Sequence, residues 1–430
     1  MLGGGTYVSQ NKKIPGSYIN FVSASKATAS TSDRGTAAMA LSLDWGPDDE
    51  IFKVTSEDFT NNTLKTFGYA YSDDSMKGLR DLFLNATTLY AYRLNSGDKA
   101  SNDYATALYS GTRGNDITIV IEENVDDSSK YDVTTMLGTK TVDEQTVSDA
   151  SELVDNDYVT FTTDATLTIT AGTPLSGGTN GTATGDAHQT FLEKLEAYSF
   201  NAVGCTSEDE TITSLYATFI KRMREDVGTK CQAVLYNTAS DYEGVVNVVN
   251  TTEESTTGLI YWVTGVIAGC AINKSNTNKT YDGEYTVNTD YTQTELENGI
   301  DSGYFMFHKV GDEVRVLKDI NSLVSTDTDK GDDFKSNQTI RVIDQVATDV
   351  AAVFNDKYIG KIQNNEAGRT SLWTDIVKLF GDYQTMQAIE DFDSSEIVVS
   401  AGDDKQSVVV DASVTPVNAM EKLYMSVIVE

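Results

Sequence analysis

The chain has 430 residues, which suits roughly two to four domains with a large core. Its formal net charge of −33 argues against a nucleic-acid backbone or an anionic lipid surface as a partner, so we expect neither nucleic-acid binding nor membrane insertion. Cys205, Cys231 and Cys270 lie far apart and form no CxxC pair, which indicates reduced thiols in a protein that folds in a cytoplasm.

The first residues differ in charge from the rest of the chain. Residues 1–32 hold three lysines and no acid, and they lack the charged-then-apolar pattern of a signal peptide. Pro15-Gly16 disfavours a helix, while residues 17–22 have the composition of a strand. Two interpretations stay open here: a frayed terminus, or a basic extended arm that lies on an acidic neighbour.

A change of composition marks an inserted unit. Strands are predicted at 37–45 and 88–94, with a helix at 73–84 between them. From 95 to 186 the chain becomes rich in Thr, Gly and Asp, with short predicted strands such as 117–121 and 158–161. Short strands between regular turns predict a β-sandwich. The glycine-rich residues 177–181 are the expected flexible joint at its end.

The next part alternates helices and strands. Phe191, Leu192, Leu195 and Tyr198 form a helical stripe, and S-x-x-E at 207–210 predicts a capping box before a second helix. Residues 231–236 form a wholly apolar strand, as in a parallel sheet covered on both faces. Residues 258–272 predict a buried helix, because this apolar run is shorter than the roughly 20 residues that a membrane span needs. These elements predict an α/β layer.

The last hundred residues predict a compact α+β domain. Helices are expected at 340–355 and 371–391, and a strand at 397–400. Residues 335–378 contain six basic and five acidic side chains, so this is the least acidic part of the folded body.

The stretch 407–430 shows two runs with a period of two, the signature of half-buried strands. Val408, Val410, Ala412 and Val414 form the first, and Leu423, Met425, Val427 and Val429 form the second. The final strand completes either the sheet of its own domain or the sheet of a partner, and an edge left open would be an aggregation hazard.

No reaction centre is predicted. The sequence contains no G-x-S-x-G elbow, so we expect neither of its two histidines, His188 and His308, to belong to a Ser–His–Asp triad. Gly360-Lys361 lacks the upstream glycine and the following Ser/Thr of a phosphate-binding loop. Asp327 begins a poor match to a calcium loop, because the glycine is one position early and position twelve is Gln338. We therefore expect no enzyme, no catalytic residue, no cofactor and no metal.

Several motifs, in order along the whole chain, resemble those of contractile tail sheath proteins of myophage-like prophages and R-type bacteriocins. They are 14–18 (IPGSY), 34–35 (RG) with 45–47 (WGP), 109–116 (YSGTRGND), 222–228 (RMREDVG), 358–361 (YIGK) with Asn364, and 416–425 (PVNAMEKLYM). The resemblance implies a multidomain α/β and α+β fold. It has a subtilisin-like α/β domain without catalytic residues (21–94 with 187–333), an inserted β-sandwich (95–186) and a C-terminal α+β assembly domain (334–430), preceded by an extended arm (1–20).

The resemblance also implies a structural role. The subunits would polymerise as a helical sheath around a rigid tail tube and shorten to drive the tube through a cell envelope, with baseplate and tail terminator proteins as further partners. Strand exchange between subunits would use Ile14, Pro15, Tyr18, Val408, Val410, Leu423, Met425, Val427 and Val429. Lys357, Lys361, Arg369 and Lys378 are candidates to face an acidic tube. The protein would be made in the host cytoplasm and end in a phage tail or bacteriocin particle.

Two other functional classes stay open. One is a hydrolase with a degenerate α/β site, which would turn over generic peptide or ester substrates. The other is a surface adhesin, suggested by the Thr-rich acidic sandwich, which would bind glycans and require a secretion signal.

Overall fold

The computed structural model describes residues 34–429, so the expected arm and the strand at 17–22 lie outside the described part. Within it the chain forms two compact units. The larger unit contains residues 34–348, 386–390 and 415–429, and the smaller one contains Asp349–Thr385 and Asp391–Val414. Each unit is described by itself.

A seven-stranded sheet forms the centre of the larger unit, in the order β14-β13-β12-β11-β1-β3-β2. Its strands are β1 (Thr36–Leu41), β2 (Ile51–Thr55), β3 (Thr88–Arg93), β11 (Ala202–Cys205), β12 (Gln232–Tyr236), β13 (Val245–Val248) and β14 (Tyr304–Phe305). All neighbours pair in parallel except β2, which runs antiparallel to β3. The strands predicted at 88–94 and 231–236 are confirmed. The strand predicted at 37–45 ends earlier, because the Leu43 N–H bonds the side chain of Asn95 instead of a neighbouring strand.

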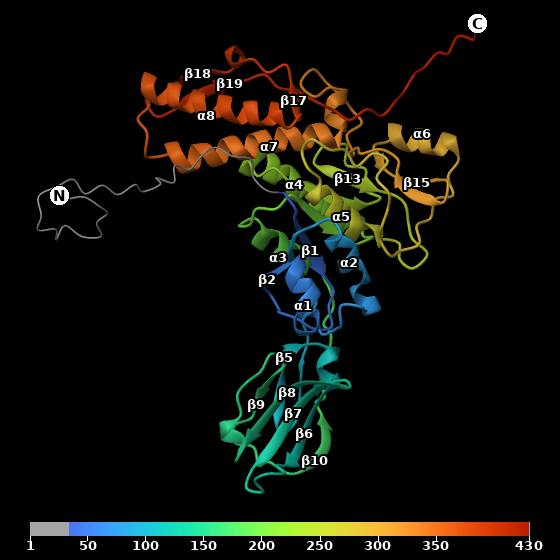
Figure 1. The fold of residues 1–430 in the computed structure, drawn as a ribbon, viewed down its shortest axis with the longest axis vertical. Coiled ribbons are helices and arrows are strands. Elements are labelled where there is room, and N and C mark those ends of the chain that lie inside the picture. The colour runs from blue at the N-terminus through green and yellow to red at the C-terminus, as the bar shows by residue number, and fades with distance from the viewer. Residues whose placement is uncertain (1–33, 430) are drawn as a thin grey trace, which may run out of the picture. The chain divides into compact units, whose positions relative to one another are not determined.

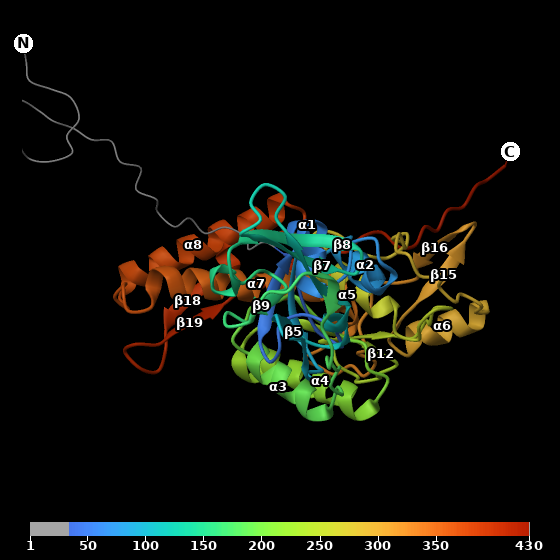
Figure 2. The ribbon, with the colours of Figure 1, turned by 90° about the horizontal axis from the view of Figure 1, so that it is seen from below.

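Helices cover both faces of this sheet (Figure 2). On one face lie α1 (Ser56–Phe67), α2 (Lys77–Phe83) and α5 (Leu259–Gly269), and on the other lie α3 (Gly185–Leu195) and α4 (Glu210–Arg222). Side chains of β1 alternate between the two cores, with Ala37 and Met39 on the α5 side and Ala38 and Ala40 on the α3 side. A side chain at Gly265 would collide with the Leu82 carbonyl, so glycine lets α5 pack closely on α2. The predicted buried helix is confirmed.

The capping box expected at 207–210 is wrong. Asp209 caps α4, and its carboxylate accepts the Thr211 N–H at 2.7 Å. The Ser207 hydroxyl instead accepts the N–H of Asp209 at 3.2 Å. Physically, the carboxylate is the stronger acceptor for the free amides at the helix start.

The β-sandwich is confirmed, and it belongs to the larger unit (Figure 1). One sheet contains β10-β6-β7-β8 and the other β4-β5-β9. The strands are β4 (Lys99–Ser101), β5 (Ala105–Ser110), β6 (Ile117–Glu123), β7 (Tyr131–Leu137), β8 (Lys140–Val147), β9 (Val159–Phe161) and β10 (Thr170–Pro174). The joint expected to be flexible at 177–181 is tied down instead. Gly178 exchanges two hydrogen bonds with the Asn115 side chain, and Asn180 bonds both Thr112 and Asp44.

Smaller elements complete the larger unit. Helix α6 (Gln293–Asp301) precedes a hairpin of β15 (Phe307–Val310) and β16 (Glu313–Val316). A short antiparallel pair joins β17 (Ile389–Glu390) to β20 (Thr415–Pro416). No helix of the part that the structure describes is long and apolar enough to cross a membrane.

The smaller unit is a helix with a hairpin. Helix α7 (Asn337–Val353) runs from the larger unit into it, and α8 (Glu366–Thr385) follows. The hairpin contains β18 (Val398–Ala401) and β19 (Val408–Asp411). Helix α8 begins and ends about five residues before the predicted bounds. It ends there because Gln387 adopts a positive φ of 61°, which does not continue a helix.

Candidate functional site

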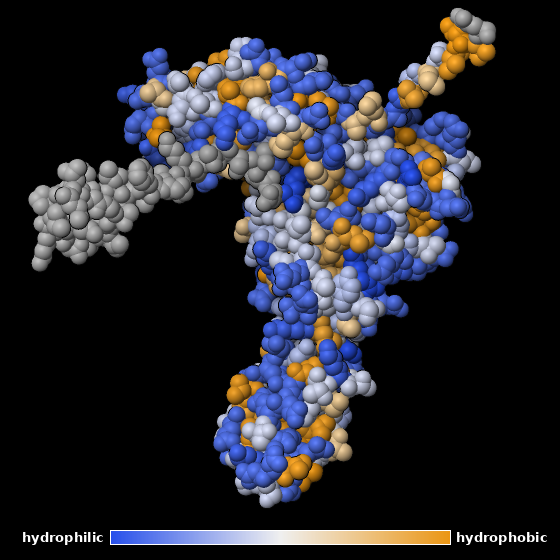
Figure 3. All heavy atoms as spheres, viewed as in Figure 1, coloured by the Kyte–Doolittle hydropathy of each residue, from blue (hydrophilic) through white to orange (hydrophobic). Residues whose placement is uncertain are grey.

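Residues 417–429, here called the terminal segment, form no strand, and the apolar side chains from Leu423 onward are exposed to solvent. The exposed fractions are 86% for Leu423, 74% for Met425, 71% for Val427 and 91% for Val429. Tyr424 and Ile428, between them, are each 87% exposed. In Figure 3 these residues form the orange end of an extended chain. A run this apolar is stable in water only when another surface covers it.

The base of the terminal segment is held on the larger unit. The Gln338 side chain donates to the Val417 carbonyl and accepts the Ala419 N–H, both at 3.0 Å. Asn418 donates to the Thr339 hydroxyl at 3.0 Å. Two residues further on, the Thr277 hydroxyl donates to Glu421 at 2.9 Å, and Lys318 lies 3.9 Å from the same carboxylate. Within residues 34–429, no hydrogen bond or ion pair holds any residue after Glu421.

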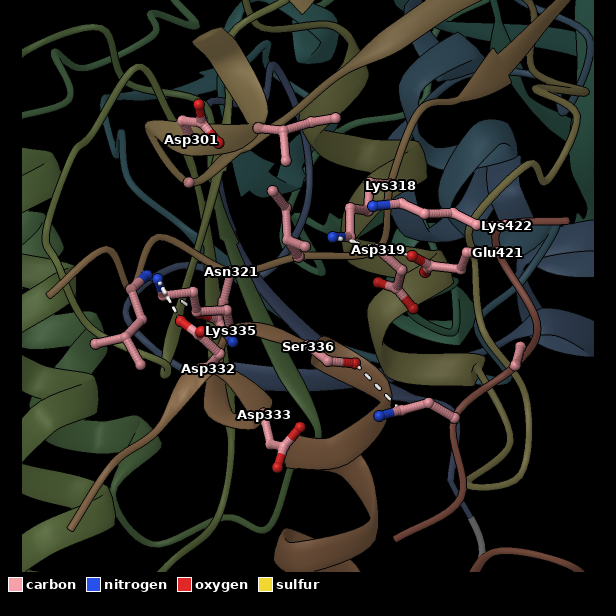
Figure 4. Close-up of a pocket in the computed structure, with 16 residues that line it drawn as sticks. Asp301, Lys318, Asp319, Asn321, Asp332, Asp333, Lys335, Ser336, Glu421 and Lys422 are labelled. Carbon is pink, nitrogen blue, oxygen red and sulfur yellow. Dashed lines mark hydrogen bonds and ion pairs between the residues drawn. The ribbon is translucent and has the colours of Figure 1, made fainter. Parts of the chain in front are cut away.

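A cavity of about 590 Å³ lies beside this base (Figure 4). One wall contains Lys318, Glu421 and Lys422, and another contains Asp332, paired with Lys335 at 2.9 Å. The cavity lining is therefore polar and mixed in charge.

In the part of the chain that the structure describes, the hairpin of the smaller unit has two free edges. Val399 pairs with Val410 and Ala401 with Val408, so Val408 and Val410 share one face as the sequence predicts. Neither strand has a second neighbour in the described chain. Val398 is 53% exposed and Val409 44%. A two-stranded hairpin is only marginally stable alone, and further strands would satisfy its open backbone groups.

Helix α8 and its entry loop support this hairpin. The Asn364 side chain donates to the carbonyls of Lys405 and Ser407, at 3.1 and 2.8 Å, and accepts from Arg369 at 2.8 Å. The Trp373 indole donates to the Ile397 carbonyl at 3.0 Å. The hairpin is thus fixed on its own unit while its edges stay open.

The candidate tube-facing residues differ in their surroundings. Lys357 pairs with Asp375 at 3.0 Å, and the Tyr358 hydroxyl donates to the same carboxylate at 2.7 Å. Burial and this carboxylate raise the pKa of Tyr358 to about 12. Lys361 is exposed and bonds the Asp356 carbonyl, while Arg369 holds Asn364. Lys378 is exposed on α8.

The histidines lie in separate structural surroundings. His188 is buried and bonds the Tyr216 hydroxyl at 2.9 Å, and burial lowers the pKa of its imidazole. His308 lies on β15. Asp327 accepts the N–H groups of Asp329 and Lys330 at 2.8 Å each, as in an ordinary acidic turn. No cluster of His, Cys, Asp and Glu in the described part could hold a metal ion.

Sequence reasoning missed the residues that hold the base of the terminal segment. In the sequence Gln338 stands out only as a misfit to a calcium loop, yet its side chain is 3% exposed and bonds backbone groups on both sides of Asn418. The only local signal is the polar pair Gln338-Thr339 at the start of an apolar helix. This pair does not predict a hydrogen-bond partner 79 residues away.

Comparison with known proteins gives consistent matches along the described chain. Family models match residues 34–94 as the N-terminal region of tail sheath protein Gp18 domain III, and 95–180 as the phage tail sheath beta-sandwich domain. The phage tail sheath central domain matches 181–322, and the C-terminal domain matches 329–430.

Individual proteins similar to this chain agree with the family models. The phage-like element PBSX protein XkdK of Bacillus subtilis (strain 168) is 34% identical, over 99% of both chains. A crystal structure of a sheath tail protein from Desulfitobacterium hafniense is 34% identical with a TM-score of 0.84, covering 95% of this chain and 99% of that one. The anti-feeding prophage helical sheath in the contracted state has a TM-score of 0.57 at 12% identity, covering 96% and 99%, and shares the fold alone.

The fold and these matches define a subunit of the tail-sheath class, similar to the sheaths of contractile injection systems. The chain belongs to the phage tail sheath protein family. The family makes it a structural component of a phage tail.

Proposed function

We propose that this protein polymerises as a helical contractile sheath around a rigid tail tube and shortens to drive the tube through a target cell envelope. Its partners would be further copies of itself, the tube protein, and the baseplate and tail terminator proteins. It would act without enzymatic activity, cofactor or metal. Synthesis in the host cytoplasm would precede its incorporation into a phage tail or bacteriocin particle.

The observation that carries this proposal is the match between an exposed apolar segment and an open hairpin on the same chain. Among residues 34–429, no strand pairs with either edge of β18–β19, and four apolar side chains of the terminal segment are exposed: Leu423, Met425, Val427 and Val429. If the terminal segment of one copy pairs with the hairpin of the next, each copy both gives and receives a strand. A contact between two different surfaces that does not close on itself generates a helical filament.

The strength of one junction would be modest. Each backbone hydrogen bond gained contributes about 0.5–1.5 kcal/mol, and each apolar side chain fully covered about 1.5–3 kcal/mol. Ordering the segment costs about 1–2 kcal/mol per residue, which offsets much of this gain. A stable sheath would therefore depend on repetition of the junction. In the same scheme Ile14, Pro15 and Tyr18 of the N-terminal arm would occupy another neighbour's hairpin.

The domain roles follow from the same scheme. We assign residues 1–20 to the arm, 21–94 with 187–333 to a subtilisin-like α/β domain, 95–186 to the sandwich and 334–430 to assembly. The parallel sheet with helices on both faces supports the α/β assignment. During shortening each copy would rotate as a rigid body while the paired strands stay connected.

A chain that ends at Lys422 tests the strand exchange. Because the removed residues make no described contact in their own copy, we expect a soluble monomer of near-normal thermal stability that forms no sheath by electron microscopy. A matched pair in the full chain sharpens the test. V427D places a charge on the face of Leu423 and Met425 and should block assembly, whereas S426D places it on the opposite face and should impair assembly less. Normal sheaths from the truncated chain would reject the proposal.

A further inference from the structure

The terminal segment is held at two places that differ in kind. At the first, Gln338 and Thr339 are 3% and 2% exposed, and they bond Val417, Asn418 and Ala419. The Val417 N–H also donates to the Ala388 carbonyl at 2.9 Å. Buried partners and backbone groups make this contact, so it opens only when the surrounding core is disturbed.

The second contact is weak and only partly buried. Glu421 accepts one hydrogen bond, from Thr277, and its ion pair with Lys318 is long at 3.9 Å, with side chains 32% and 33% exposed. Exposed ion pairs of this kind add little stability and are screened by salt. Between the two contacts Met420 is fully exposed, with no described hydrogen bond. Rotation at Met420 would thus release Glu421 without disturbing the first contact.

We infer that Glu421 is a releasable latch that sets the direction in which the terminal segment leaves its subunit. Thr277 is the receptor, Lys318 assists it, and the contact of Gln338 with residues 417–419 is the permanent anchor. The inference rests on the proposed strand exchange, because direction matters only when a second copy receives the segment. Glu421 acts here as a positioning residue.

The half-buried Thr277 hydroxyl is held in place by a buried neighbour, Asp319. The Thr277 oxygen accepts the Asp319 N–H at 3.0 Å and the Ser275 hydroxyl at 3.1 Å, which leaves its own proton to donate to Glu421. The Asp319 carboxylate is in turn fixed by Arg341 at 2.6 Å, and both side chains are 1% exposed. The hydroxyl therefore keeps its position whether or not Glu421 is bound.

The cavity next to the latch gives the segment room to move. Asn418, Glu421 and Lys422 form part of its lining, opposite Asp332 and Lys335 (Figure 4). A segment that leaves Thr277 can enter this space before it meets the far wall. We therefore expect the latch to open when a rotating neighbour pulls on the paired strand, while the anchor keeps the subunits connected.

The rate at which trypsin cleaves the monomer after Lys422 measures how readily the Glu421 latch opens. A protease must bind extended chain on both sides of the cut, so a latched Glu421 shields the bond after Lys422 until it opens. K318Q removes the assisting charge, and T277V with K318Q removes both contacts, while the cleaved sequence stays unchanged. We expect the cleavage rate to rise several-fold from wild type to K318Q to the double variant.

Controls separate the latch from general loosening. Cleavage after Lys405, in the hairpin loop, serves as the internal reference and should not change. T277S keeps the hydroxyl and should cleave like wild type, and E297A on α6 removes an unrelated surface carboxylate. Added NaCl should accelerate the cut after Lys422, relative to the reference, more in wild type than in K318Q. Equal rates at Lys422 in wild type, K318Q and the double variant would overturn the latch. Strand exchange is judged separately, by the sheath assembly of the chain that ends at Lys422.

Discussion

The ring centroids of Trp45 and Tyr109 lie 5.2 Å apart at an interplanar angle of 84°, and this contact joins the loop after β1 to the β-sandwich. Trp45 is fully buried among sandwich residues and also stacks on Tyr158 at 6.4 Å. Its indole N–H donates to the Lys65 carbonyl of α1 at 3.0 Å. A residue outside the sandwich thus completes the sandwich core, so the two parts share packing.

We expect W45A to destabilise the larger unit by about 3–5 kcal/mol, because it removes a buried aromatic ring from a core shared by two parts. Urea unfolding of the monomer measures this change. W45F is the matched control. It keeps much of the ring volume, loses the bond to Lys65 and should cost less. A loss below about 1 kcal/mol for W45A would contradict the shared core.

We expect that the sandwich can be deleted without loss of assembly if Trp45, which packs in the sandwich core, is replaced as well. The chain enters and leaves the sandwich at neighbouring points, since a side chain on Gly181 would collide with the Ser96 carbonyl. A short linker can therefore join Leu94 to Thr182 after deletion of the residues between them. We expect this deletion with W45S to form tubes under electron microscopy, and the same deletion with Trp45 retained to aggregate. A folded W45S deletion that never polymerises would show that the sandwich is required for assembly.

The buried Arg224–Asp344 pair should be far costlier to break than an exposed ion pair. Its two hydrogen bonds measure 2.6 and 2.8 Å, and the side chains are 6% and 8% exposed. D344N leaves the guanidinium without its counter-charge, so we expect a loss of about 3–5 kcal/mol in urea unfolding. The exposed Arg222–Glu196 pair is the control, with side chains 43% and 40% exposed. E196Q should cost less than about 1 kcal/mol, and similar losses at both sites would contradict the role of burial.

Among the candidate tube-facing residues, Lys361 gives the cleanest test. It is exposed, whereas Lys357 is paired with Asp375 and Arg369 supports the hairpin through Asn364. If Lys361 holds the extended sheath on an acidic tube, K361E should increase the fraction of contracted or tube-free sheaths seen by electron microscopy. K405E makes the same charge change in the hairpin loop and should have a smaller effect. An unchanged extended fraction for K361E would reject this contact.

The cysteines should be unreactive in the folded protein. Burial raises the pKa of Cys205 to about 11 and that of Cys231 to about 12, so both stay protonated thiols at pH 8. Burial also raises the pKa of Cys270, which is only partly exposed. We expect a thiol reagent at pH 8 to modify Cys270 slowly and the other two only after denaturation. Mass spectrometry identifies the sites, and native modification of Cys231 would contradict the structure.

Elements with a local signal could be predicted from the sequence. Apolar runs predicted β12 and α5, and a period of two placed Val408 and Val410 on one face of β19. Composition located the sandwich, because short strands and turns leave a regular pattern. The family was recognisable from motifs that the structure places at fixed junctions, such as Trp45 in the sandwich core and Arg224 in a buried pair.

Contacts between residues far apart in sequence became visible only in the folded chain. The glycines at 177–181 predicted a flexible segment, yet hydrogen bonds to Asn115 and Asp44 fix it. The sequence pattern does not show these bonds, because the partners come from distant parts of the chain. The period of two in Leu423–Val429 predicted a strand, but a strand forms only when a neighbouring edge supplies its hydrogen bonds. In the described chain no strand edge pairs with this segment, so these side chains remain exposed. Pairing and capping depend on partners far away in sequence, and a local pattern does not specify them.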